Sequence, residues 1–185
     1  MTRAIRFAAV ASLAAALPVV GQGTGTVEIG AFARYTDFDR SLAMNSAVGV
    51  GAQATIHLER AVALELDVSR TSAGRPGGGS VSYTPVHVRL VAAFPAGNRL
   101  DVLLGGGAVR NSYGGPLDAS DGGVSALLGL RYRLSERMSL RGGLDADFMV
   151  HSGNPQASPF TFYSGNWGLQ LGATLRLKGG GAAHP

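Results

Sequence analysis

Apolar and polar residues alternate along most of this chain, and residues 62–69 show the pattern most clearly. Glu65 and Asp67 lie on one side of this stretch, because successive side chains of a β-strand point to opposite faces. The other side is wholly apolar and consists of Val62, Leu64, Leu66 and Val68. A period of two over this length predicts a strand whose two faces meet different media.

The same alternation recurs in seven other stretches and predicts an all-β chain of eight strands. The expected strands cover residues 26–38, 46–58, 62–69, 81–94, 99–113, 121–134, 138–150 and 160–177. Short turns are expected at 59–61, 95–98 and 135–137, and longer loops at 39–45, 72–80, 114–120 and 151–159. Short links between alternating runs are typical of hairpins, so we expect an antiparallel up-and-down barrel.

Several features of this pattern are typical of a transmembrane barrel. An even strand number, short turns at one end and roughly 9 to 11 membrane-crossing residues per strand are characteristic of outer-membrane proteins. Closure of the sheet also leaves no strand edge unpaired, which is a requirement inside a bilayer. The fold class expected is therefore an eight-stranded antiparallel transmembrane β-barrel.

The polar face combines small residues with charges of both signs, which suits a narrow lumen better than a wet exterior. Glu65 and Asp67 are expected to face His87 and Arg89 across one hairpin, because unpaired charges inside a barrel are costly. Arg131, Arg133 and Arg141 are expected to meet Asp145 and Asp147 in the same way. The predicted lumenal ion network comprises Glu65, Asp67, His87, Arg89, Arg131, Arg133, Arg141, Asp145 and Asp147.

Aromatic residues gather near the ends of the expected strands, as in the interfacial girdles of membrane barrels. Phe94 and Tyr132 are close to the short turns. Near the longer loops are Tyr35, Phe38, Tyr83, Tyr113, Phe148, Phe160, Phe162, Tyr163 and Trp167. Of these, Tyr35, Phe94, Tyr132, Phe148 and Trp167 are predicted to lie at the membrane interfaces.

The N-terminus has the pattern of a secretory signal peptide. Arg3 and Arg6 precede an apolar stretch at 7–20, and small residues follow. This predicts a signal peptide at 1–21, a barrel domain at 22–177 and a flexible Gly/Ala tail at 178–185. The chain contains no cysteine, which excludes disulfides and thiolate metal sites.

The net charge of the chain is modest once the signal is set aside. The formal charge is +4, from 16 basic and 12 acidic residues. Arg3 and Arg6 would leave with the signal, so 14 basic residues remain against the same 12 acidic ones. The basic residues are spread singly along the strands, which argues against a nucleic-acid partner.

The signal, strand count, loop pattern and lumenal charges together make residues 26–177 resemble the small eight-stranded outer-membrane barrels of the OmpA transmembrane-domain and OmpX types. The resemblance implies residence in the outer membrane of a Gram-negative-type bacterium. It also implies three partners: outer-membrane lipid, the barrel-insertion machinery and an external ligand at the loops.

Candidate catalytic groups are few, and each has a structural interpretation. Asp145 and Asp147 share one strand face, as an acid/base or metal pair would, but nearby arginines favour an ion network. His151 and Ser152 lie at the expected external rim, where lipid-A deacylases of similar fold place a His and a Ser. The glycine pattern at 49–54 lacks the helix that a nucleotide site requires. We therefore predict no catalytic residue, metal or cofactor.

The leading functional interpretation is a non-enzymatic outer-membrane barrel with a lumen filled by side chains and a structural or surface-contact role through four external loops. Eight strands leave just enough room for side chains to fill the interior. Three alternatives remain open from sequence: a small pore or channel, a soluble lipocalin-like periplasmic carrier with the apolar face inward, and a lipid-A modifying enzyme.

Overall fold

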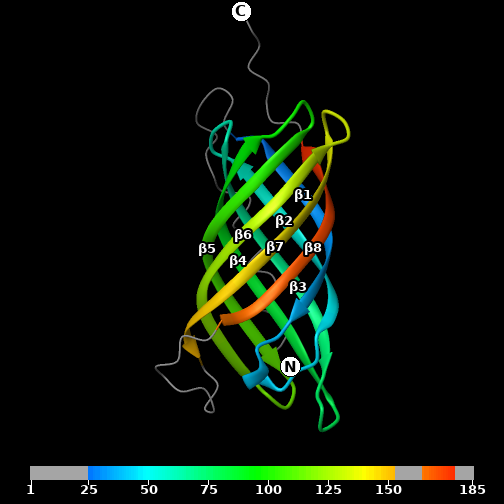
Figure 1. Ribbon diagram of the computed structural model, residues 1–185, viewed down its shortest axis with the longest axis vertical. Coiled ribbons are helices and arrows are strands. Elements are labelled where there is room, and N and C mark those ends of the chain that lie inside the picture. The colour runs from blue at the N-terminus through cyan, green and yellow to red at the C-terminus, as the bar shows by residue number, and fades with distance from the viewer. Residues whose placement is uncertain (1–24, 153–163, 178–185) are drawn as a thin grey trace, which may run out of the picture.

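The computed structural model describes residues 25–152 and 164–177, which form a single closed barrel (Figure 1). Its strands and one short 3₁₀ helix follow in chain order. They are β1 (Val27–Asp37), η2 (Arg40–Leu42), β2 (Ala47–His57), β3 (Val62–Gly74), β4 (Ser80–Pro95), β5 (Leu100–Gly114), β6 (Ala119–Arg133), β7 (Met138–Ser152) and β8 (Ser164–Leu177). The predicted all-β, eight-stranded antiparallel fold is confirmed.

Each strand pairs antiparallel with its neighbours in sequence, and β1 also pairs with β8. The closure is extensive, since the β1–β8 register runs from Val27 opposite Leu177 to Asp37 opposite Trp167. Backbone groups on every strand thus find partners on both sides, as a lipid environment demands. No helix among the residues described is long and apolar enough to cross a membrane.

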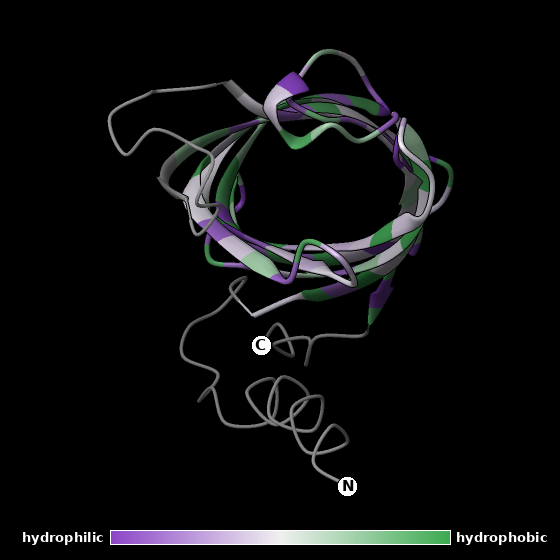
Figure 2. Ribbon diagram, turned by 90° about the horizontal axis from the view of Figure 1, so that it is seen from below, coloured by the Kyte–Doolittle hydropathy of each residue, from purple (hydrophilic) through white to green (hydrophobic). Residues whose placement is uncertain are grey.

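The apolar face of the sheet points outward and the charged face points inward. Leu128 and Leu169 are each 53% exposed, whereas Glu65 and Arg89 are at most 1% exposed. Viewed from the end, hydrophilic and hydrophobic segments are interspersed in the strands of the wall (Figure 2). This orientation is the reverse of a ligand carrier with an apolar interior, so the soluble lipocalin-like alternative is wrong.

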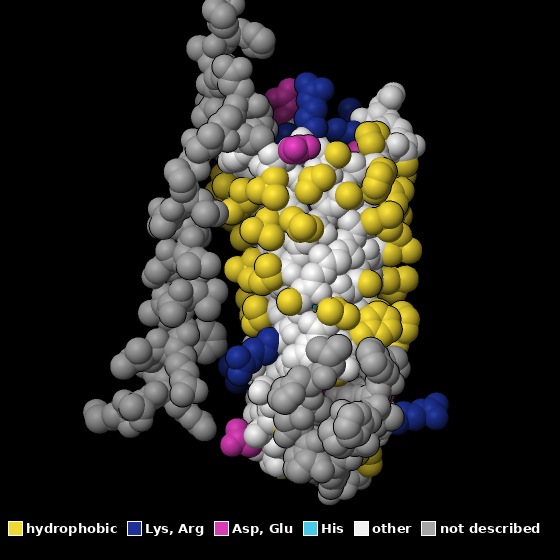
Figure 3. Space-filling model, turned by 90° about the vertical axis from the view of Figure 1, so that its left-hand side faces the viewer, with side chains coloured by type: hydrophobic (Ala, Val, Ile, Leu, Met, Phe, Trp, Pro, Cys, Tyr) yellow, Lys and Arg dark blue, Asp and Glu magenta, His cyan; other side chains and the backbone are white. Residues whose placement is uncertain are grey.

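Outward apolar side chains cover much of the wall between the two ends, as one side of the barrel shows (Figure 3). The members of this apolar belt come from all eight strands and include Ile29, Val50, Val68, Val88, Leu104, Leu128, Leu144 and Leu171. A belt of this kind matches the hydrocarbon core of a bilayer, which only apolar side chains contact at low cost.

Two of the predicted longer loops are shorter than expected, because the flanking strands extend into them. β3 and β4 stay paired as far as Gly74 and Ser80, so only 75–79 connects them, and β5 and β6 are linked by 115–118. The expected loop at 72–80 was too long, because Ala73 continues the inward alternation of β3 and is fully buried. Gly78 closes this hairpin with a φ of 88°, a left-handed conformation that glycine adopts freely.

Some predictions fall on residues outside those described. They concern the signal peptide at 1–21, the tail at 178–185, and the aromatic residues Phe160, Phe162 and Tyr163. Within the predicted barrel domain at 22–177, the described strands begin at Val27 and end at Leu177.

Candidate functional site

A cluster of buried charges, the ion cluster, fills the middle of the lumen. It consists of Arg34, Glu65, Asp67, His87, Arg89, Arg141, Asp145 and Asp147, which come from β1, β3, β4 and β7. The register of β3 and β4 sets Glu65 opposite Arg89 and Asp67 opposite His87. All eight side chains are buried, so each charge depends on the others for its stabilisation.

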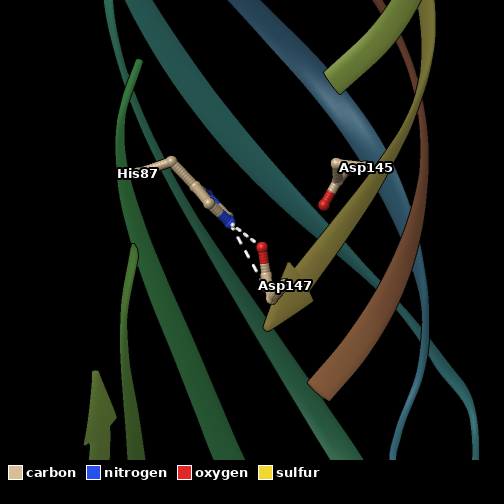
Figure 4. Close-up of side chains that lie close together, drawn as sticks. All are labelled: His87, Asp145 and Asp147. Atoms are coloured by element: carbon tan, nitrogen blue, oxygen red, sulfur yellow. Dashed lines mark hydrogen bonds and ion pairs between the residues drawn. The ribbon is translucent and has the colours of Figure 1, made fainter. Parts of the chain in front are cut away.

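His87 lies between carboxylates from two strands. Its Nδ1 is 2.8 Å from Asp67 Oδ1. Its Nε2 is 3.1 Å from Asp147 Oδ1 (Figure 4). A carboxylate only accepts hydrogen bonds, so both ring nitrogens donate when both contacts are satisfied. The imidazolium form meets that condition, and it fixes the ring between β3 and β7.

Arginines complete the ion cluster across the lumen. Arg34 bonds Asp145 and lies 3.8 Å from Asp147, while Arg89 bonds Asp67 and lies 3.6 Å from Glu65. Arg141 bonds the other oxygen of Glu65. With His87 charged, the cluster holds equal numbers of cations and carboxylates, which is the arrangement that makes buried charges tolerable.

Three members of the ion cluster also have the spacing of metal ligands. One ligand atom from each of His87, Asp145 and Asp147 lies within 4.8 Å of the others. The same carboxylates already bond Arg34 and His87, which supply the positive charge that a metal would bring. The donor set therefore fits an internal ion network better than a metal centre.

The predicted pairing of Arg131, Arg133 and Arg141 with Asp145 and Asp147 was wrong. Arg131 Nε is 3.1 Å and Arg133 Nη2 3.3 Å from Asp101, while Arg141 bonds Glu65. Arg141 and Asp145 lie four residues apart on one strand, about 13 Å at the usual rise per residue, so they cannot meet. Arg34 from β1 takes the place of these arginines.

A second polar layer lies nearer the short turns. Glu28 is 3.1 Å from both His57 Nε2 and Arg176 Nη2, and Arg131 connects this group to Asp101. Beyond it the lumen widens into a cavity of about 850 Å³ that opens at the short-turn end. We call this cavity the vestibule.

The loop end of the lumen is closed by an apolar cap. It consists of Phe38, Leu42, Met44, Ala73, Val81, Tyr83 and Tyr113. The β1–β2 connection folds inward through η2, whose start is capped by the Asp39 carboxylate accepting from the Ser41 backbone N–H at 2.8 Å. Leu42 is thereby 98% buried inside the mouth of the barrel.

Aromatic contacts hold the apolar cap together, and an amide layer lies at its base. The rings of Phe38 and Tyr83 meet edge to face with centroids 4.9 Å apart. The Asn166 amide donates to the Tyr83 and Tyr113 hydroxyls at 3.1 and 3.2 Å. The Tyr83 hydroxyl in turn donates to Asn111 at 2.9 Å.

Phe38, Tyr83 and Tyr113 were expected among the interfacial aromatics, and that expectation was wrong. All three are buried inside the barrel. The alternation itself contains the missing signal: Tyr83 has the same parity as His87, and Phe38 the same parity as Arg34, so each belongs to the inward face. Parity therefore decides the face of these rings, and proximity to a strand end does not.

The remaining interfacial aromatics point away from the lumen. Tyr35, Phe148 and Trp167 lie on the outward face toward the loop end, and Phe94 and Tyr132 toward the short turns. Each is between 38% and 52% exposed. We propose that these five residues form the aromatic girdles at the two membrane interfaces.

The backbone of His151 and Ser152 belongs to β7, and their side chains lie outside those described.

Sequence reasoning missed several lumenal residues that the structure brings together. They are Glu28, Arg34, Asp101, Asn111, Asn166 and Arg176. Parity marks all of them as inward-facing, so the face was predictable. Their partners were not, because most of the contacts cross the lumen between strands that are not neighbours.

The closed wall, outward apolar belt and ionic lumen define an integral outer-membrane β-barrel. Residues 6–162 match the family model described as outer membrane protein beta-barrel domain, and the chain belongs to that family. The protein is therefore a transmembrane barrel of the Gram-negative outer membrane, in contact with its lipid. No curated protein matches the sequence.

Solved structures of small outer-membrane barrels share the fold. Neisserial surface protein A matches with a TM-score of 0.58 and 15% identity over 85% of this chain and 97% of its own. OprG from Pseudomonas aeruginosa matches with a TM-score of 0.58 and 13% identity over 86% and 99%. The N-terminal barrel of Pseudomonas aeruginosa OprF matches with a TM-score of 0.51 and 20% identity over 84% and 100%.

Proposed function

We propose that this protein is a non-enzymatic barrel with a closed lumen, which serves the outer membrane as a structural and surface-contact element. The proposal is based on two groups of side chains that close the lumen at successive levels along the barrel axis. The apolar cap blocks the loop end, and the ion cluster blocks the middle with side chains that are all buried. An ion entering this path would have to displace Arg34 from Asp145.

The connections at the loop end are the part of the protein that meets external partners in this proposal. Outer-membrane barrels keep their short turns in the periplasm and their other connections outside. In the β1–β2 connection, Leu42 and Met44 anchor the segment while Arg40, Ser41 and Asn45 stay exposed. A connection that is anchored in this way presents a defined surface, as binding loops on rigid scaffolds do.

Planar-bilayer recording tests the closed lumen. The wild-type barrel is expected to give no unitary conductance steps. A combined variant, Leu42→Gly with Arg34→Gly and Asp145→Gly, removes part of the cap and one complete ion pair, and it is expected to conduct. The matched control is Leu58→Gly, which changes an exposed leucine and is expected to stay silent. Steady wild-type conductance would overturn the proposal.

A small pore is the second candidate, and one observation favours it. Besides the open vestibule, a space of about 20 Å³ lies further in, between the two polar layers, and is lined by residues that include Glu65 and Arg131. Wild-type conductance that is lost on Arg131→Trp would favour the pore over the closed barrel.

Antibody labelling of intact cells tests which end of the barrel faces the cell exterior. An epitope inserted at Gly78, in the 75–79 connection, is expected to bind antibody on intact cells. The same epitope inserted at Gly97, in the 96–99 turn, is expected to bind only after permeabilisation. The reverse pattern would place the short turns outside and overturn the surface-contact role.

A further inference from the structure

Charged side chains make up half of the lining of the vestibule at the short-turn end. Its volume is about 850 Å³, within the range of small-ligand sites. The charged residues that line it are Glu28, Arg99, Arg133, Glu136, Arg137 and Arg176. Four arginines thus face two glutamates, and arginine side chains are visible at this end of the barrel (Figure 3).

The positive charge of the vestibule is only partly neutralised. Glu28 is bonded by Arg176, and Arg133 is bonded to Asp101 deeper in the wall. Arg99 and Arg137 form no ion pair with any residue that the structure describes, and both are exposed. A cleft lined by one sign of charge concentrates counter-ions, so the vestibule attracts anions.

The vestibule faces the aqueous mouth and not the lipid. Arg133 and Arg176 belong to the inward parity of β6 and β8, as their bonds to the lumenal Asp101 and Glu28 show. Leu134 and Leu177, which are more than 40% exposed, border the mouth beside them. A lipid headgroup would have to pass this rim while its acyl chains stayed outside, which favours a water-soluble ligand.

We propose that the vestibule binds a soluble oxyanion with at least two negative charges, carried by phosphate or carboxylate groups. Planar guanidinium groups bond such oxyanions in a bidentate manner. Arg99 and Arg137, which form no ion pair within the described part of the chain, supply the principal contacts. Arg133 and Arg176 form the inner wall, held in place by Asp101 and Glu28. Short turns of outer-membrane barrels face the periplasm, so the ligand comes from that side.

Isothermal titration calorimetry of the folded barrel in neutral detergent micelles tests this site, with inorganic pyrophosphate as the probe at roughly 0.15 M salt. Wild-type protein is expected to bind one pyrophosphate saturably. The double variant Arg99→Gln/Arg137→Gln is expected to bind at least about tenfold more weakly, since two charge-assisted contacts are lost. Heat-modifiable gel mobility verifies that each variant is folded.

The matched control is Arg70→Gln/Arg110→Gln, which removes two exposed arginines from the outward face near the loop end. This control is expected to leave pyrophosphate affinity unchanged. No saturable binding by the wild type, or an equal loss in both double variants, would overturn the proposal.

A second experiment, with lipid, distinguishes binding of a soluble oxyanion from binding of a lipid headgroup. Native mass spectrometry of the barrel released from phosphatidylglycerol nanodiscs reports bound lipid. Lipid retention that falls in the Arg99→Gln/Arg137→Gln variant, together with no pyrophosphate binding, would assign these arginines to a lipid headgroup and overturn the soluble site. Loss of pyrophosphate binding with unchanged lipid retention supports it. This test does not depend on whether the deeper lumen is closed or conducts ions, because the vestibule lies outside that part of the barrel.

Discussion

Arginines occur in two contrasting settings in this barrel, the ion cluster and the vestibule. Arg34 and Arg89 in the ion cluster have no exposed surface and bond carboxylates from other strands. At the vestibule, the side chain of Arg133 is 40% exposed and that of Arg176 is 43% exposed. Arg133 Nη2 lies 3.3 Å from Asp101 Oδ1, and Arg176 Nη2 lies 3.1 Å from Glu28 Oε1. The residue type is the same, and the access to water differs.

This difference separates a structural role from a binding role. A buried charge that loses its partner keeps the whole cost of its desolvation, so the ion cluster needs every member. An exposed ion pair contributes little because water replaces the lost partner. Arginines at the vestibule are therefore accessible to a ligand from water, whereas those in the ion cluster are not.

Breaking the ion cluster is expected to have the largest effect. Asp145→Ala leaves Arg34 buried beside a cavity and should destabilise the barrel by about 3–5 kcal/mol. Urea unfolding in lipid vesicles, followed by Trp fluorescence, measures the change. The control Glu59→Ala alters an exposed turn carboxylate and should leave the midpoint unchanged. A loss below about 1 kcal/mol would contradict the interpretation that the cluster supports the fold.

An arginine on the lipid-facing wall provides a third setting, with neither partner nor water. Leu128→Arg, near the middle of the apolar belt, should destabilise the barrel by about 2–4 kcal/mol. Leu128→Ile keeps the apolar surface and should unfold close to the wild-type midpoint. Equal stability of the arginine variant would show that this wall does not face hydrocarbon. The same vesicle unfolding assay applies.

Two glycines allow the packing of the lumen to be compared with that of the outer face. A Cβ at Gly168 would lie 2.6 Å from Asp145 Oδ1 and 2.8 Å from Arg34 Nε, so Gly168→Ala should displace that ion pair at a cost of about 1–3 kcal/mol. A Cβ at Gly106, on the outer face, would meet its nearest neighbour at 3.8 Å. Gly106→Ala is the control and should be tolerated, so similar midpoints for the two variants would contradict the close packing at Gly168.

Weakening the vestibule is expected to have the smallest effect on stability. Arg176→Gln removes a partly exposed bond to Glu28 and should cost about 0–1 kcal/mol. Glu28 keeps His57 at 3.1 Å, so it is not left alone. Thermal unfolding monitored by heat-modifiable mobility measures the shift. A loss as large as that of Asp145→Ala would remove the distinction between the two sets of arginines.

Much of the architecture follows from the sequence alone. Alternation in stretches such as 62–69 predicted the strands, the outward apolar belt and the inward face, because side chains of a strand must point to opposite sides. It did not predict the length of the hairpins at 75–79 and 115–118, where inward small residues such as Ala73 resemble a loop until they pack in the apolar cap.

Only the tertiary structure decided which residues meet across the lumen, between strands that are not neighbours. Arg34 reaches Asp145 from β1 to β7, and Arg141 reaches Glu65 from β7 to β3, across the interior of the barrel. Local sequence specifies the face of a residue, because the period of a strand is fixed by its backbone. Contacts across a lumen depend on the stagger and tilt of all eight strands at closure, and no single stretch of the chain encodes these.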